Sequence, residues 1–332
     1  MLWRISTRLL WALFTIWAVV TLAFFINQTL PTDPARAVAG PQARPADVAR
    51  IRKELGLDRP VLAQYRIFLG RLVHVTTADA SSREHASCAR FGSLHVDLGT
   101  SYQMRKPVVT VIGERFPRTF FLALAAVLVQ VLLGVSMGVV AAVKRRSAWD
   151  YGTVTLTLVG ISAPTFLTGI LLQYVFGYRL RWLPLDGFGR TLGEHAVCIV
   201  LPALTLGIAG AAYYTRLVRD DMIDLLQQDF IRTARAKGVA PFGVVVKHAL
   251  RNALLPLVTV VGLDLGTLVG GAIVTEKLFR WPGLGQLSVD SVFARDAPII
   301  IGTVIVASTA IVLSNLLVDV SYALLDPRVR AK

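Results

Sequence analysis

Long apolar runs alternate with charged segments along the whole chain. A helix needs about 20 apolar residues to cross the roughly 30 Å hydrocarbon core of a bilayer. Six runs reach that length: Leu9–Leu30, Thr119–Val143, Tyr151–Tyr178, Ala196–Val218, Leu254–Thr275 and Ile299–Leu325. The pattern predicts an all-α, polytopic membrane protein with six transmembrane helices.

The first run has features of a signal peptide as well as of a helix. Arg4 and Arg8 precede it, and Ala35-Arg36-Ala37 imitates a cleavage site. Its apolar core is longer than the roughly 7 to 15 residues of a signal-peptide core. We therefore predict that residues 1–30 form a retained transmembrane helix.

The stretch between the first two runs predicts a small folded domain. Helical apolar spacing covers Ala46–Leu55 and Val61–Val73, with a Gly/Pro break between them. The polar stretch Val75–His95 has no clear period and predicts an exposed loop.

Basic residues in the short loops set the predicted orientation, because cytoplasmic loops are richer in Lys and Arg than outer loops. With the N-terminus inside, the inner segments carry 15 Lys/Arg and the two short outer loops carry six. Both termini are therefore predicted to be cytoplasmic, and the small domain extracytoplasmic. The chain is predicted to have four parts. They are a first helix (1–30), an outer domain (31–118), a five-helix core (119–325) that contains the cytoplasmic segment 219–253, and a tail (326–332).

Composition excludes an ordinary soluble protein. Hydrophobic residues make up 54% of the 332 residues, charged residues make up only 17%, and the mean hydropathy is +0.59. The formal net charge is +14, from 35 Lys/Arg against 21 Asp/Glu. In a membrane protein, basic loops that face anionic membrane lipid account for this excess without a nucleic-acid partner.

Motifs for catalysis or cofactor binding do not support an enzyme. The phosphate-binding GxxxxGK[ST] and the zinc-protease HExxH are absent. The five histidines are scattered without metal-ligand spacing: His74, His85, His95, His195 and His248. Cys88 and Cys198 form no CxxC pair, and a single disulfide between them stays open. The sequence predicts no metal and no cofactor in this chain. If the protein does energy-dependent work, another chain must supply the energy, because the phosphate loop that binds ATP is absent.

Polar residues inside the runs are candidates for a translocation pathway. Asp264 lies near the middle of the fifth run, where a charge is costly. It lies about 200° around the helix from a ridge of small residues that permits close packing: Gly262, Gly266 and Gly270. Asp264 therefore faces either a polar pathway or a second helix that it hydrogen-bonds, and both interpretations stay open. Further pathway candidates in other runs are Gln130, Gln173 and Asn315. A second glycine ridge in the second run consists of Gly134 and Gly138.

The segment between the fourth and fifth runs is basic and amphipathic. Apolar residues in Met222–Lys237 recur on one helical face: Ile223, Leu226, Phe230 and Ala234. Gly238 marks the end of this helix, and Pro241 begins a second amphipathic helix. The small residues Ala234, Ala236 and Gly238 leave a flat corner between the two. Such a pair can lie on anionic lipid or present its corner to another protein, and the pattern alone leaves both open.

The same segment resembles a known family at the level of individual residues. Asp229–Gly238, DFIRTARAKG, is similar to the cytoplasmic EAA loop of permease subunits in dipeptide/oligopeptide ABC importers, which depend on a binding protein, and His248–Pro256, HALRNALLP, continues the similarity. Further matching segments are Leu55–Pro60, Phe279–Gly285, Asn315–Asp319 and Asp326–Arg330. Pro31–Pro34 and Val96–Gly99 depart from the family pattern, and Val75–His95 looks like an insertion.

The resemblance implies a subunit that pairs with a homologous second permease, two cytoplasmic ATPase subunits that bind the ATP, and an extracytoplasmic substrate-binding protein, in the bacterial cytoplasmic membrane. It implies that the ATPase-coupling residues are Arg232, Thr233, Ala234, Arg235, Ala236, Lys237, Gly238, His248, Leu250 and Arg251. Short peptides are the implied substrates, with nickel complexes or oligosaccharides as alternatives. The rival from another class is a self-sufficient secondary transporter or channel with Asp264 as its proton or ion site.

Overall fold

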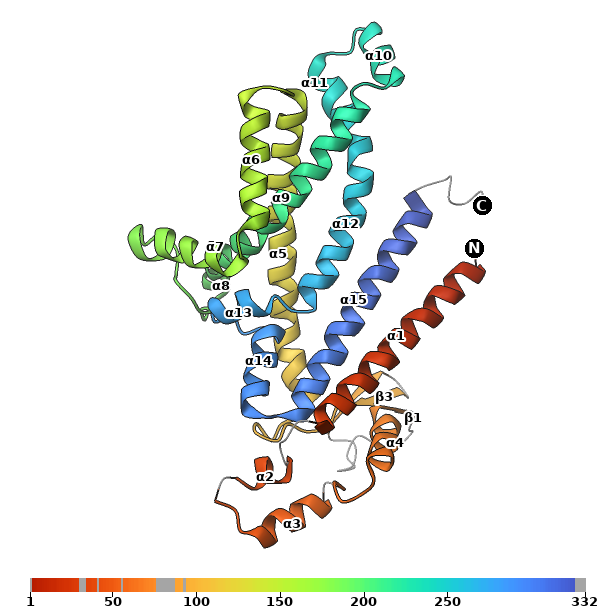
Figure 1. Ribbon diagram of the computed structural model, residues 1–332, viewed down its shortest axis with the longest axis vertical. Coiled ribbons are helices and arrows are strands. Elements are labelled where there is room, and N and C mark those ends of the chain that lie inside the picture. Colours follow the sequence, from red (N-terminus) through yellow and green to blue (C-terminus); the bar gives the residue numbers. More distant parts are fainter. Residues whose placement is uncertain are drawn as a thin grey trace. The chain divides into compact units, whose positions relative to one another are not determined.

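The computed structural model describes residues 2–29, 34–40, 42–54, 56–75, 87–91 and 94–325 (Figure 1). The chain divides into two compact units, Met1–Arg118 with Pro282–Leu313, and Thr119–Trp281 with Ser314–Lys332. Residues 282–313 join the first unit and not the predicted five-helix core, because their buried side chains pack on the first turns of α5 (Val108–Val143).

The first unit begins with the long helix α1 (Leu2–Thr29). The short helices α2 (Pro34–Ala39), α3 (Pro45–Glu54) and α4 (Val61–Leu72) follow, and α3 and α4 lie where the apolar spacing predicts two helices. Aromatic contacts hold α4 on α1. Phe24 stacks on Phe68 with 5.2 Å between ring centroids, and the hydroxyls of Thr21 and Tyr65 are 2.6 Å apart.

A small antiparallel sheet follows α4. Its strands are β1 (Val73–Val75), β2 (Cys88–Phe91) and β3 (Leu94–Asp97), in the order β1-β3-β2. The prediction of an exposed loop over Val75–His95 is therefore wrong for Val75, Cys88–Phe91 and Leu94–His95, which lie in the three strands. The reason is that such short strands are stabilised by pairing with neighbours, which the local pattern does not show. Residues 76–86, including His85, and the tail 326–332 lie outside the described residues.

A buried aspartate organises the end of the first unit. Asp296, only 1% exposed, accepts a hydrogen bond from the Ser101 hydroxyl and from the backbone N–H groups of Tyr102 and Gln103, at 3.1 and 3.2 Å. It lies between α14 (Leu284–Ala294) and α15 (Ala297–Leu325). Burial, and secondly the nearby Asp296 carboxylate, raise the pKa of Tyr102.

Five helical segments of the described residues are long and apolar enough to cross a membrane: Ser6–Ile26, Val108–Val143, Leu192–Leu225, Pro241–Val269 and Ala297–Val318. A sixth span results if the bent pair Ala148–Ser162 and Thr165–Arg179 is counted as one. The predicted number of six is reached only with this pair.

The third predicted run is not a single helix. α6 (Ala148–Ser162) ends at Ser162, and α7 (Thr165–Leu172) with the π-helix η2 (Gln173–Arg179) continues at 105° to it. Ala163 has an extended backbone with ψ of 127°. The cause is Pro164, because a proline disfavours the helical region for the residue before it.

The helices of the fourth and fifth predicted runs begin and end at other residues than the sequence predicts. α8 (Leu192–Cys198) and α9 (Val200–Leu225) extend the fourth run on both sides. In the fifth, α11 (Pro241–Gly243), the π-helix η3 (Val244–Leu250) and α12 (Arg251–Val269) form one continuous helical segment. The second amphipathic helix is thus the beginning of the fifth span, not a separate short helix. Gly271, with a φ of +125°, separates α12 from α13 (Ile273–Leu278), where the predicted run still continued.

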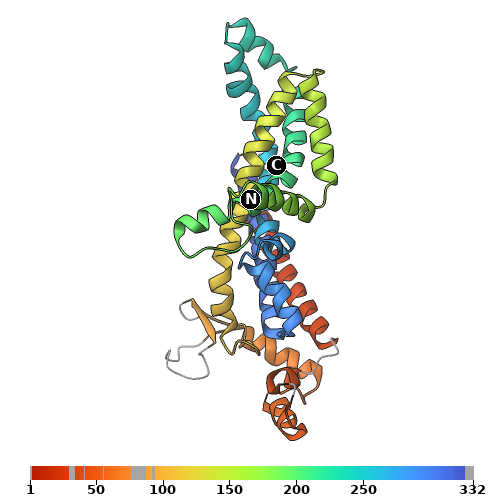
Figure 2. The ribbon, with the colours of Figure 1, turned by 90° about the vertical axis from the view of Figure 1, so that its left-hand side faces the viewer.

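Within the second unit, α6 packs beside α9, and α9 beside α12 (Figures 1 and 2). α10 (Asp229–Ala236) and α11 stand together at one end of these helices (Figure 1). This arrangement places the basic segment at the ends of two spans.

Candidate functional site

The basic segment is attached to the spans through one buried face of α10. α9 ends at Leu225, and a turn over residues 226–228 separates it from α10. Ile231 and Ala234, 0% and 6% exposed, belong to a core cluster shared with α5, α9, η3 and α12. The prediction of one helix over Met222–Lys237 is wrong, because the turn resets the helical phase. Phe230 is 42% exposed, and Ile231 is the buried anchor instead.

The corner after α10 is closed by a glycine-dependent cap. Val239 N–H donates to Ala234 O at 3.2 Å, and Gly238 N–H donates to Arg235 O at 3.0 Å. These are the two hydrogen bonds of a Schellman motif. Gly238 has the φ of +77° that the motif requires of the residue after the helix, and Val239 packs against the core cluster. The predicted stop at Gly238 therefore has a specific backbone geometry.

Most of the predicted coupling residues on α10 and at the corner face outward. The exposed members are Arg232, Thr233, Arg235, Ala236, Lys237 and Gly238. Ala234 is buried in the chain's own core, so it is not part of a surface that a partner can touch. His248 and Leu250 are half-buried on η3, which α10 contacts, and Arg251 is exposed at the start of α12.

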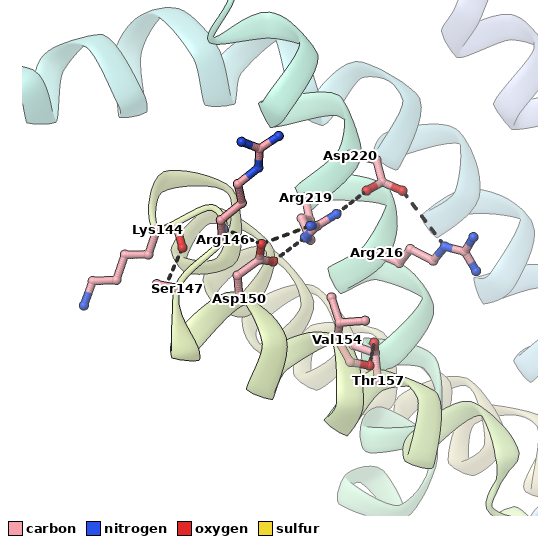
Figure 3. Close-up of polar contacts among 9 residues, drawn as sticks. All are labelled: Lys144, Arg146, Ser147, Asp150, Val154, Thr157, Arg216, Arg219 and Asp220. Atoms are coloured by element: carbon pink, nitrogen blue, oxygen red, sulfur yellow. Dashed lines mark hydrogen bonds and ion pairs between the residues drawn. The ribbon is translucent and has the colours of Figure 1, made fainter.

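An ion-pair chain holds α6 to α9 (Figure 3). Arg219 on α9 donates from Nε and Nη2 to the two carboxylate oxygens of Asp150 on α6, at 2.6 and 3.1 Å. Asp150 also accepts the backbone N–H of Arg146 at 2.9 Å. Arg219 continues to Asp220 at 2.8 Å, and Asp220 lies 4.0 Å from Arg216. The Asp150 side chain is only 4% exposed, and its ion pair with Arg219 fixes the first turn of α6 on α9.

Replacing Asp150 with asparagine is expected to lower the free energy of unfolding by about 2 kcal/mol, because charge-assisted hydrogen bonds to a buried carboxylate are lost. The matched control is Asp220→Asn, which contacts the same Arg219 but is 55% exposed, and should cost about 0.5 kcal/mol. Thermal melting of the purified protein in detergent measures both. Equal shifts for the two variants would contradict the role assigned to Asp150.

A second polar contact lies between the spans. The Tyr214 hydroxyl on α9 donates to Asp264 Oδ2 on α12 at 3.1 Å, and the Gln130 side chain on α5 also interacts with this carboxylate. Asp264 and Gln130 are thus brought together. Gln173 instead donates to the backbone oxygens of Leu185 and Leu278, and Asn315 is exposed on α15. Tyr214 was not among the sequence candidates, because nothing local marks a tyrosine as the partner of an aspartate 50 residues away.

Three of the five predicted glycines lie at close helix contacts. A Cβ on Gly138 would lie 2.8 Å from the backbone oxygen of Thr215, and one on Gly134 would overlap Tyr214, both on α9. A Cβ on Gly262 would overlap Val318 on α15. Gly266 is buried within α12, and Gly270 ends that helix.

Gly134–Gly138 reads GVSMG and so has the letters of the hydrolase GxSxG motif. The motif needs its serine on a sharp turn between a strand and a helix. Here Ser136 lies inside α5, and its hydroxyl donates to Leu132 O at 2.6 Å. The match carries no catalytic geometry.

The membrane-spanning helices, two of which carry the basic corner at their ends, define a polytopic membrane protein. Two family models place it further: "Binding-protein-dependent transport system inner membrane component" matches residues 112–331, and the N-terminal model of the same membrane components matches residues 1–123. The chain belongs to this family of ABC-importer permeases. It is therefore a bacterial inner-membrane transport subunit and not an enzyme.

Relatives and a solved structure agree with this assignment. The chain is 42% identical to the glutathione transport system permease protein GsiC of Salmonella choleraesuis (strain SC-B67), over 332 residues and all of both chains. It is 40% identical to the GsiC protein of Escherichia coli (strain K12), again over both full lengths. The MetNI methionine ABC transporter in an inward-facing conformation matches with a TM-score of 0.55 and 20% identity over 66% of this chain and 98% of that one, which shows the shared fold.

The disulfide that the sequence left open is not formed. Cys88 lies on β2 in the first unit, Cys198 ends α8 in the second, and neither is in a disulfide bond.

Proposed function

We propose that this permease couples ATP hydrolysis on partner ATPase subunits to movement of its transmembrane helices through the α10 corner. The observation that carries the proposal is the way α10 is held. Its inner face, Ile231 and Ala234, shares a core with the ends of α9 and α12, whereas its outer face is exposed. A partner that pushes on the outer face would move both spans, because packed cores transmit displacement as rigid bodies.

The proposed assembly has the composition that the family implies. A homologous second permease completes the pathway, two cytoplasmic ATPase subunits bind ATP and dock at the corner, and a binding protein delivers substrate from outside. Both termini and the corner then lie in the cytoplasm, as the basic loops predict.

The chemistry of the exposed corner suits a protein partner. Arg232, Arg235 and Lys237 present three cations around the small Ala236, and Asp229 offsets only one of them through its 3.3 Å contact with Arg232. Ala236 lets another surface approach closely, and the surrounding cations favour a partner surface that carries carboxylates. A helix pair that only rested on lipid would need no small-residue corner.

We propose short peptides as the substrates, and glutathione, a tripeptide, as the first to test. The support is the 42% identity over full length to permeases named for glutathione transport. Nickel complexes and oligosaccharides are the alternatives within such importers. The binding protein would supply most of the selectivity.

The rival, a self-sufficient transporter with Asp264 as its ion site, gains no support from the geometry. Asp264 accepts a hydrogen bond from Tyr214 and interacts with Gln130, which satisfies its carboxylate between three packed helices. This is the structural interpretation that the sequence left open.

Photo-crosslinking tests the docking surface directly. The Ala236→Cys variant, co-expressed with its ATPase subunits and labelled with a benzophenone maleimide in membranes, is expected to give a light-dependent adduct of permease and ATPase. Ala236 is exposed at the centre of the cationic corner. The adduct is identified by its mass and by mass spectrometry.

The matched control is Ala294→Cys, an exposed alanine on the predicted outer loop. It should give no ATPase adduct, and the unmodified chain with its two native cysteines gives the baseline. Equal ATPase adducts from both variants, or only lipid adducts from Ala236→Cys, would refute docking at the corner.

A further inference from the structure

Three metal-binding side chains lie on one face of the small sheet. β1 and β3 pair so that His74 is directly opposite His95. β2 and β3 pair so that Cys88 is opposite Asp97, which is two residues from His95 and so on the same face of β3. The strand register alone therefore brings His74, Cys88 and His95 together, one from each strand.

Their ligand atoms are close to the spacing of a metal site. One ligand atom from each of the three residues lies within 4.8 Å of the other two, and Cys88 Sγ is 4.0 Å from His74 Nε2. A tetrahedral zinc ion with bonds of about 2.1 Å to nitrogen and about 2.3 Å to sulfur spaces such a pair about 3.6 Å apart. A shift of a few tenths of an ångström closes that pair around an ion.

The surroundings orient one of the ligands. His74 Nδ1 is 3.0 Å from the backbone oxygen of Arg71, which favours a proton on Nδ1 and leaves Nε2, the atom that faces Cys88, as the electron-pair donor. Metal-binding histidines usually have such a contact from the other ring nitrogen. Arg71 also pairs with the buried Asp97 at 3.1 Å, so the C-terminal end of α4 is fixed to β3.

We propose that His74, Cys88 and His95 bind a zinc ion. Two imidazoles and a thiolate are ligands that zinc prefers, and the fourth position of its tetrahedron is left for water or another ligand. The ion joins all three strands. A sheet whose strands have only three or four residues is marginal by itself, so the metal stabilises the fold at this place. The site is independent of the proposed coupling function.

Metal analysis of the full-length permease tests the proposal. The protein, purified in detergent without chelators and with no metal-affinity step, is expected to carry one zinc per chain by plasma mass spectrometry. After removal of zinc, added Co²⁺ should produce thiolate-to-cobalt charge-transfer absorption. Cys88→Ser is expected to lose both the zinc and this absorption, and His74→Ala to lose the zinc.

Two variants outside the cluster serve as controls. Cys198→Ser and His248→Ala change the same residue types elsewhere and should retain zinc. Protection of thiols gives a readout in the unmodified protein: zinc should slow maleimide labelling of Cys88 and leave Cys198 unaffected. Zinc at the level of the buffer blank, zinc that survives Cys88→Ser, or copper in its place would overturn the assignment. Size-exclusion profiles show whether each variant is folded.

Discussion

Replacing Ile231 with aspartate is expected to abolish ATP-driven uptake, because it destroys the attachment of α10 to the transmembrane helices. Ile231 is 0% exposed, in the core cluster that joins α10 to α9, η3 and α12. Truncating a buried isoleucine alone costs about 2–5 kcal/mol. An uncompensated carboxylate at the same place adds several kcal/mol more. α10 would then detach from the core cluster, and force applied to its outer face would no longer reach the spans.

Two assays on the same complexes test this expectation. One measures uptake of labelled substrate into membrane vesicles, and the other measures ATP hydrolysis. Hydrolysis without uptake is the expected signature, and faster proteolysis of the segment 226–240 should accompany it. Ile231→Ala provides a milder variant, with partial loss of uptake, in case the aspartate prevents assembly.

The neighbouring Phe230→Asp is the matched control. Phe230 is 42% exposed and lies outside the buried cluster, so the same substitution one position away should leave most of the uptake. If Phe230→Asp abolishes uptake and Ile231→Asp does not, the buried attachment of α10 is not the element that transmits force.

The helices could be predicted from the sequence wherever length and local stereochemistry decide the outcome. Apolar runs of sufficient length gave the spans, and Gly238 gave the end of α10, because a Schellman cap needs a residue that adopts positive φ easily. The bend at Ala163 is equally local. It follows from Pro164, which restricts the backbone of the preceding residue, so that a proline inside the third run predicts a kink at this place.

The sequence predictions are wrong where contacts between residues far apart in the sequence determine the local structure. The spacing from Ile223 to Phe230 imitates one helical face, but the turn after Leu225 shifts the phase, and burial then falls on Ile231. The strand Cys88–Phe91 exists because it pairs with β3. The spacing of the histidines along the sequence also predicts no metal site. His74 and His95 come together only because their strands pair.

The position of the candidate coupling site is predicted from the sequence, but the contacts within and around it are not. The family resemblance pointed to residues 232–238, and six of these seven positions are exposed, whereas Ala234 is internal. The Asp150–Arg219 and Tyr214–Asp264 contacts join residues 69 and 50 positions apart. A single sequence contains no local pattern that pairs them.

Replacing Gly134 with alanine is expected to destabilise the protein by about 3 kcal/mol, because overpacking a close contact costs about 1–3 kcal/mol and more where backbone must move. A Cβ at this position would overlap the Cβ of Tyr214 and lie 3.2 Å from the backbone oxygen of Ala211. Neither atom can move aside without α9. Displacing α9 would also stretch the hydrogen bond from Tyr214 to Asp264, so a single methyl group disturbs both the packing and the polar contact between the spans.

The same helix supplies the control. A Cβ on Gly113, also in α5, would meet no atom within 4 Å, so Gly113→Ala should be neutral or stabilising by up to about 1 kcal/mol through helix propensity. Thermal melting of both variants in the same detergent separates the two effects. If Gly134→Ala melts no lower than Gly113→Ala, then α5 and α9 do not pack at the distance described. The small residues of α5 would then serve helix flexibility and not close contact.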